Sequence, residues 1–317
     1  MFGTRFATAA LACGAVLTTA ACGSVASEDS PGRTITAAFY PLEWVSERVA
    51  GDAWEVDNLT QPGGDPHDLS IGLAETAALE QSALVVISRG LQAGVDDTVD
   101  SVAQGEVLDA ATVVDLVPVE DTGSAAGHDE GHEHDEEDHE GHDHGDLDPH
   151  FWHDPLRMAD LADAVAERLS SIDPDGADGY SQRAAEVRAE LEELDTAFSQ
   201  GLSSCTRDTV VVSHAAFGYL SRYGLHFAPI AGLSPDAEAT PATLGQLHEL
   251  IEHEGITTVF TERLASPKMA ESLAADTGLD TAVLDPLEGL SDETADEDYL
   301  SLMRANLDAL HAANGCA

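Results

Sequence analysis

Short apolar, β-branched runs alternate with helical stretches in two blocks of this chain, and no other feature constrains its fold as strongly. In the first block the pattern predicts strands at 34–40, 54–59, 83–88 and 113–117, with helices that include 42–50 and 70–80. In the second block it predicts strands near 208–213, 226–230, 257–260 and 281–284, with helices between them and a last helix at 296–312. Such alternation indicates parallel sheets built by right-handed crossovers.

Two helical stretches separate the blocks, at 155–171 and 175–201, with a break at Asp173-Pro174. The longer stretch places apolar residues on one side: Tyr180, Ala184, Val187, Leu191, Leu194 and Phe198. We therefore predict an α/β protein of two similar lobes, each with a parallel β-sheet flanked by helices. The lobes span 34–173 and 203–317, and one long backbone α-helix within 174–202 joins them.

The first 22 residues have the pattern of an export signal, with a positive start, an apolar stretch and small residues before Cys22. Cleavage there would leave Cys22 for lipid attachment, followed by a polar tether over 23–33. Thr19 departs from the aliphatic residue usual in lipoproteins, so plain secretion, to the periplasm or the medium, stays open. No later run reaches the ~18 apolar residues of a membrane span. We expect an extracytoplasmic, lipid-anchored protein.

The four cysteines fall into two groups. Cys13 leaves with the signal and Cys22 would carry lipid, which leaves Cys205 and Cys316 in an oxidising setting. We expect one disulfide that ties the C-terminal tail to the start of the 208–213 strand. Two free thiols, or thiolate metal ligands, are the alternatives.

Charge is strongly unbalanced, with 60 acidic and 13 basic residues and a formal net charge of -47. This charge argues against nucleic acid as a partner and favours cationic ligands, or simply a very soluble surface.

Residues 120–147 differ in composition from the rest of the chain, because acids, glycines and histidines replace almost every apolar residue. Such a segment buries too little surface to fold, and we expect a disordered loop. Its histidines are expected to bind Zn²⁺ loosely: His128, His132, His134, His139, His142 and His144. A solvated acidic insert with incidental histidines is the alternative.

Three histidines and one aspartate lie at predicted strand ends or loops: His67, His150, His214 and Asp285. Ligands of α/β sheets bind at the carboxyl ends of strands. Three imidazoles and one carboxylate make a tetrahedral zinc set, so we predict that these four residues capture zinc. For Asp285, which precedes a proline, a turn or N-cap aspartate is the alternative.

Nine short motifs resemble those of the metal-receptor branch of ABC-transporter solute-binding proteins, in particular its high-affinity zinc members. The resemblance covers residues 34–312, and the motifs are Phe39–Leu42, Val49–Asp52, Gly64–His67, Asp148–Trp152, Ser213–Leu220, Tyr223–Leu225, Thr261–Leu264, Ser266–Met269 and Leu284–Leu287. The resemblance implies a monomeric receptor that holds zinc between its lobes and delivers it to a membrane permease with a separate ATPase. It implies the same four ligands, His67, His150, His214 and Asp285.

The same resemblance bears on which metal ion is bound and on the residues near the ligands. Manganese-type relatives often carry a carboxylate where this chain has His214, and imidazole suits Zn²⁺ better than harder Mn²⁺. His153 stands where an apolar residue is usual; it is either a group that supports a ligand, a spare ligand or a partly exposed histidine. Glu262 follows the predicted strand at 257–260, so it could also approach the metal. We rank it below Asp285 as a ligand and expect a supporting acid.

Other functions remain as alternatives. A secreted zinc hydrolase would use the three histidines with Asp285 or Glu262 as base, but the chain lacks a His-Glu-x-x-His helix, a Gly-x-Ser-x-Gly elbow and a P-loop. We therefore expect no enzyme. A receptor for manganese or another transition metal, and an adhesive surface lipoprotein, are the remaining alternatives.

Overall fold

The computed structural model describes residues 32–119, 147–237 and 239–317. The predicted signal with Cys22, and the histidines predicted to bind loose zinc in the 120–147 loop, lie outside the described residues.

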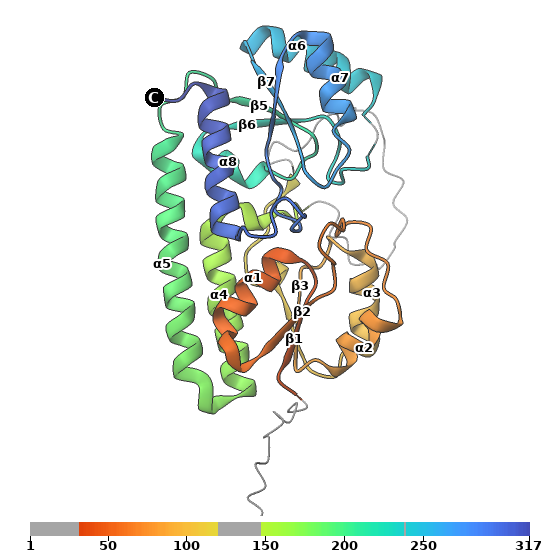
Figure 1. The fold of residues 1–317 in the computed structure, drawn as a ribbon, viewed down its shortest axis with the longest axis vertical. Coiled ribbons are helices and arrows are strands. Elements are labelled where there is room, and N and C mark those ends of the chain that lie inside the picture. The colour runs from red at the N-terminus through yellow and green to blue at the C-terminus, as the bar shows by residue number, and fades with distance from the viewer. Residues whose placement is uncertain (1–31, 120–146, 238) are drawn as a thin grey trace, which may run out of the picture. The chain divides into compact units, whose positions relative to one another are not determined.

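The first lobe is built on a four-stranded parallel sheet (Figure 1). Its strands are β1 (Thr34–Ala37), β2 (Glu55–Asn58), β3 (Leu84–Ile87) and β4 (Glu106–Asp109), in the order β2-β1-β3-β4. Helices α1 (Tyr40–Ala50), α2 (Leu73–Gln81) and α3 (Ala93–Val102) connect them. All four residues of β3 are fully buried, as expected for a central strand covered on both faces.

The fourth strand is not where the sequence pattern placed it. The prediction of a strand at 113–117 is wrong, because β4 is Glu106–Asp109 and pairs with β3 from Leu84↔Glu106 to Ile87↔Asp109. An edge strand needs little apolar surface, and in β4 only Leu108 is buried. The more apolar 113–117 segment follows a short 3₁₀ helix, Ala110–Thr112, and contributes Val114 to the core from a turn.

The second lobe repeats the topology of the first. Strands β5 (Thr209–Val212), β6 (His226–Pro229), β7 (Thr258–Thr261) and β8 (Asp280–Val283) form a parallel sheet in the order β6-β5-β7-β8. Helices α6 (Pro241–Glu254) and α7 (Lys268–Thr277) lie between the later strands. Each sheet therefore has its second strand at one edge and its first strand beside the third, which confirms the prediction of two similar lobes.

Three further helices complete the architecture: α4 (Pro155–Ile172), α5 (Ala177–Gly201) and α8 (Tyr299–Asn314). Helix α5 packs against α1 and α4 of the first lobe and against α8 of the second (Figure 1). Its buried residues are the six that the helical pattern predicted. The predicted α/β fold with one long joining helix is confirmed. Among the described helices, none is both long and apolar enough to cross a membrane.

The C-terminal tail is fastened to the second lobe as predicted. Cys205 and Cys316 form a disulfide, and the backbone N–H groups of Thr206 and Arg207 donate to the carbonyl of Asn314. The end of α8 is thereby held at the start of β5.

Candidate metal centre

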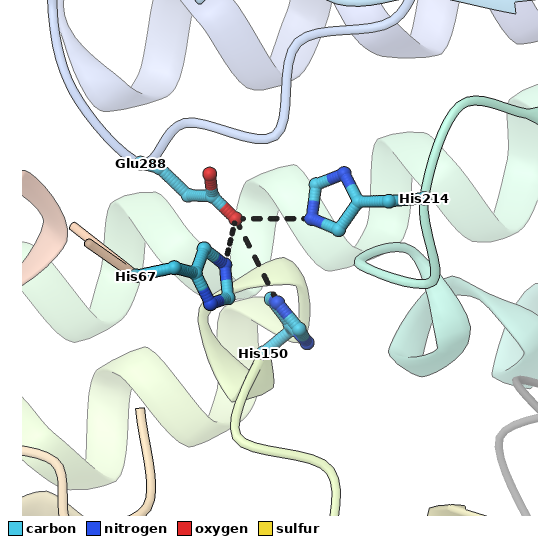
Figure 2. Close-up of side chains that lie close together, drawn as sticks. All are labelled: His67, His150, His214 and Glu288. Atoms are coloured by element: carbon cyan, nitrogen blue, oxygen red, sulfur yellow. Dashed lines mark hydrogen bonds and ion pairs between the residues drawn. The ribbon is translucent and has the colours of Figure 1, made fainter. Parts of the chain in front are cut away.

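Three histidines and one glutamate converge from both lobes: His67, His150, His214 and Glu288 (Figure 2). One ligand atom from each residue lies within 4.8 Å of the other three. The three imidazole rings form a nearly equilateral arrangement, with centroids 5.5, 5.5 and 5.8 Å apart. Glu288 Oε1 lies 3.2 Å from His67 Nε2, 3.3 Å from His214 Nε2 and 3.6 Å from His150 Nε2.

Loops at strand ends supply these side chains. His67 lies in the loop between β2 and α2, and His150 directly precedes a 3₁₀ helix, Phe151–His153. His214 follows β5 by two residues, and Glu288 follows β8. The structure thus brings together the three histidines that the sequence singled out.

Two Asp-Pro-His turns present two of the histidines. Asp65 Oδ1 accepts the His67 backbone N–H at 2.8 Å, and Asp148 Oδ1 accepts the His150 backbone N–H at 3.0 Å. An aspartate that accepts the N–H two residues later forms an Asx turn, and the intervening proline restricts its backbone. The repeated sequence therefore has a local structural purpose, which is to present the imidazole that ends it.

The fourth predicted ligand requires a correction, because the carboxylate beside the imidazoles belongs to Glu288 and not to Asp285. Asp285 forms a third turn of the same kind, in which its Oδ1 accepts the Leu287 backbone N–H at 2.9 Å. Its Oδ2 lies 3.2 Å from Arg263 Nε. Asp285 is therefore a turn aspartate, which is the alternative given above for this residue. The sequence pattern did not identify Glu288, which lies just beyond the turn.

Leu287 explains how Glu288 reaches the cluster. Its φ of 57° lies in the left-handed region, which is unfavourable for a branched side chain, and its side chain is fully buried. The reversal of the chain at this residue lets the leucine fill the core while the next side chain points at the imidazoles (Figure 2). The signal in the sequence was the Asp285-Pro286 pair, which, like the Asp-Pro pairs before His67 and His150, marks a turn that presents a nearby residue.

Burial and charge strengthen the interactions within the cluster. His150 and His214 are fully buried and Glu288 is 3% exposed. Burial opposes ionisation of Glu288, but hydrogen bonds and charge from His214 and His67 outweigh it and hold its pKa well below the usual range. Burial would likewise lower the pKa of His214, but the carboxylates of Glu262 and Glu288 raise it to about 10. Without metal, an imidazolium–carboxylate pair therefore holds the cluster together.

The distances from Glu288 to the three imidazoles fit a tetrahedral zinc ion. Zinc bonds of about 2.0–2.1 Å to nitrogen and oxygen place neighbouring ligand atoms about 3.3 Å apart. The oxygen-to-nitrogen distances of 3.2, 3.3 and 3.6 Å lie close to that edge length. His150 Nε2 is also buried without a hydrogen-bond partner among the described residues, as expected for an atom that serves as a ligand.

Glu262 and His153 lie next to the cluster in different ways. Glu262 Oε1 is 2.8 Å from His214 Nδ1, on the side of the ring away from Glu288. His153 is fully buried, so the expectation of a partly exposed histidine is wrong. Its ring packs against Trp152 and Phe217, with centroids 6.0 and 4.9 Å away, and neither nitrogen has a hydrogen-bond partner among the described residues.

His153 should make the protein less stable in mild acid. Burial, followed by repulsion from His150, lowers its pKa from 6.5 to about 3. Below pH 6.5 this histidine binds a proton in the unfolded chain but not in the native state. The free energy of unfolding therefore falls as the pH is lowered from 6.5 to about 3. His153 alone should lower the free energy of unfolding by about 2 kcal/mol between pH 7 and pH 5.

His153→Leu tests this contribution. Denaturant titrations at pH 7 and pH 5 should show a smaller loss of stability in the variant, with equal or higher stability at pH 7, since leucine leaves no polar atom unpaired. Equal pH dependence in both proteins would contradict a neutral, buried His153.

Comparisons with known proteins relate the chain to proteins of zinc uptake. The family profile described as "Zinc-uptake complex component A periplasmic" matches residues 35–313. The chain is 33% identical over 294 residues to the zinc-binding lipoprotein AdcA of Streptococcus pneumoniae, covering 92% of this chain. It is 32% identical over 305 residues to the high-affinity zinc uptake system protein ZnuA of Bacillus subtilis, covering 93% of both chains.

A solved structure is similar over most of the chain. The Zn(II)-bound ZnuA-like domain of Streptococcus pneumoniae AdcA superposes with a TM-score of 0.71 at 29% identity, covering 89% of this chain and 99% of that domain. The present chain spans 57% of the length of the full AdcA relative.

Proposed function

Because the chain belongs to the family of periplasmic A components of zinc-uptake complexes, we propose that it is an extracytoplasmic receptor for zinc. It captures Zn²⁺ between its two lobes and delivers the ion to an ABC permease driven by a separate ATPase. The observation that supports this proposal is the convergence of three imidazoles and one carboxylate, whose ligand atoms all lie within 4.8 Å of one another.

The proposed ligands are His67, His150, His214 and Glu288. With all four positions filled by protein atoms, the site suits capture and release, whereas a catalytic zinc keeps one position for water. The receptor is therefore not an enzyme in this proposal. Zinc must displace the proton that His214 shares with Glu288, so affinity rises with pH. The lobes span 34–173 and 203–317, as the sequence pattern suggested.

The proposal also includes attachment of the receptor to the membrane and weak binding of further zinc by the loop histidines. Cys22 carries a lipid that holds the receptor, as a monomer, at the outer face of the membrane; the AdcA relative is named a lipoprotein. The loop histidines His128, His132, His134, His139, His142 and His144 bind further zinc weakly. The net charge of -47 draws cations toward the protein.

Competitive titration with Zn²⁺ and Mn²⁺ tests this function. We expect one tight zinc equivalent and weaker Mn²⁺ binding, because three imidazoles favour zinc over the harder ion. In a variant without residues 121–146, the tight equivalent should remain and the weaker zinc should disappear. Preference for Mn²⁺ would contradict the cargo, and loss of the tight equivalent with the loop would contradict the cluster as the site.

A further inference from the structure

A single carboxylate oxygen contacts both the backbone and the ring of His214. Glu262 Oε1 accepts the His214 backbone N–H at 3.2 Å and lies 2.8 Å from its Nδ1. Asp148 Oδ1 contacts His150 in the same way, at 3.0 Å from the backbone nitrogen and 2.8 Å from Nδ1. We call this arrangement the carboxylate clamp.

The clamp fixes both the tautomer and the orientation of each ring. A carboxylate on Nδ1 requires a proton there, so Nε2 is the nitrogen left for a metal. Because the backbone N–H binds the same oxygen, the ring cannot turn without losing one of the two contacts. Both carboxylates are almost fully buried, with side chains 2% exposed for Glu262 and fully buried for Asp148, so little water competes.

The two clamps differ in origin. Asp148 lies two residues before His150, so its contact is part of the Asp-Pro-His turn. Glu262 directly follows β7 and is 48 residues from His214, so only the packing of β7 beside β5 brings the two together. Such a contact is not a by-product of local backbone geometry.

His67 provides an internal comparison. Asp65 accepts the His67 backbone N–H at 2.8 Å, but no carboxylate among the described residues is hydrogen-bonded to His67 Nδ1. The Asp-Pro-His turn can thus present a histidine without a clamp on its ring.

We propose that Glu262 is a positioning residue for zinc capture, which acts through His214 by holding its Nδ1 proton and leaving Nε2 for the ion. This inference rests on the proposed function. The carboxylate charge also makes the imidazole a stronger donor, so Glu262 contributes to affinity without touching the metal.

Glu262→Gln separates charge from geometry. The glutamine oxygen can accept both N–H groups, but it carries no charge, whereas Glu262→Ala removes the contact altogether. Chelator competition in the full chain should show Zn²⁺ binding weakened about 10-fold in the first variant and about 100-fold in the second, the range found when a group behind a metal ligand is lost.

Glu271→Gln is the matched control. It is the same change of residue type at an exposed side chain of α7, in the same lobe, and it affects neither a clamp nor a turn that presents a ligand. Its zinc affinity should change by less than about threefold, as for a substitution that breaks no specific contact. An equal loss in Glu271→Gln and Glu262→Gln would overturn the proposal, because general negative charge would then account for both.

Ring-nitrogen NMR of the metal-free protein supplies a readout that does not depend on zinc. We expect a hydrogen-bonded Nδ1 proton on His214 in the wild type and in Glu262→Gln, and its loss or rapid exchange in Glu262→Ala. An unchanged Nδ1 signal in Glu262→Ala would overturn the clamp even if zinc binds tightly. Absence of tight zinc binding with a normal Nδ1 signal would contradict the proposed function and leave the clamp standing.

Discussion

Glu288→Ala should weaken Zn²⁺ binding by at least about 10²- to 10³-fold. Glu288 supplies the only carboxylate among the four residues of the cluster, and its Oε1 lies within 3.6 Å of all three imidazole Nε2 atoms. Its loss leaves a buried cation without its negative partner, which costs about 3–5 kcal/mol for buried ion pairs. Chelator competition at constant pH measures the affinity.

Two neighbouring acids provide controls. Asp285→Asn keeps an oxygen that can accept the Leu287 N–H, but it removes the charge that faces Arg263. The zinc affinity of this variant should therefore fall only several-fold. Glu293→Ala removes an acid of the same segment whose side chain is 77% exposed, and its affinity should be unchanged. If Asp285→Asn lost as much affinity as Glu288→Ala, the assignment of the fourth ligand to Glu288 would be wrong.

Loss of the disulfide should have the largest effect on stability. The Cys205–Cys316 bond closes a segment with a sequence separation of 111 residues, which includes the whole second sheet. Without it the unfolded chain gains entropy, and the free energy of unfolding should fall by about 2–5 kcal/mol. Denaturant titration of the Cys205→Ser/Cys316→Ser variant, with zinc removed, measures this difference.

Reductant supplies the control for this prediction. A thiol reductant should shift the unfolding midpoint of the wild type toward that of the variant and leave the variant unchanged. The same midpoint for oxidised wild type and variant would contradict a stabilising role for the bond.

The sequence pattern was sufficient for the fold wherever strands are buried on both faces. The runs that became β3 and β5 consist of apolar residues except for Thr209, and each is almost fully buried. It failed at β4, which has one buried residue in four and a carboxylate at each end, although it placed the equally exposed edge strands β2 and β8. The competing 113–117 run is more apolar, but it contributes to the core from a turn.

The site was predictable as far as local turns define it. His67 and His150 each end an Asp-Pro-His turn, and His214 follows a buried strand, so all three could be placed at strand ends or loops. Glu288 could not, because its position depends on the left-handed backbone at Leu287. Periodicity and motif spacing carry no information on that one dihedral angle.

The sequence pattern did not predict the long-range contacts near the site either. Glu262 reaches His214 only through the pairing of β5 with β7. His153 is buried because Phe217, 64 residues later in the chain, covers its ring. Residue type suggested a polar or exposed position for this histidine, but the packing of the two lobes decides its environment.

Diffraction at the zinc absorption edge, from crystals of the full chain loaded with one equivalent of Zn²⁺, is the most direct test of the proposed capture site. We predict one strong anomalous peak about 2.0–2.2 Å from His67 Nε2, His150 Nε2, His214 Nε2 and a Glu288 oxygen. A peak beside Asp285, or a peak bound only by loop histidines, would contradict the account.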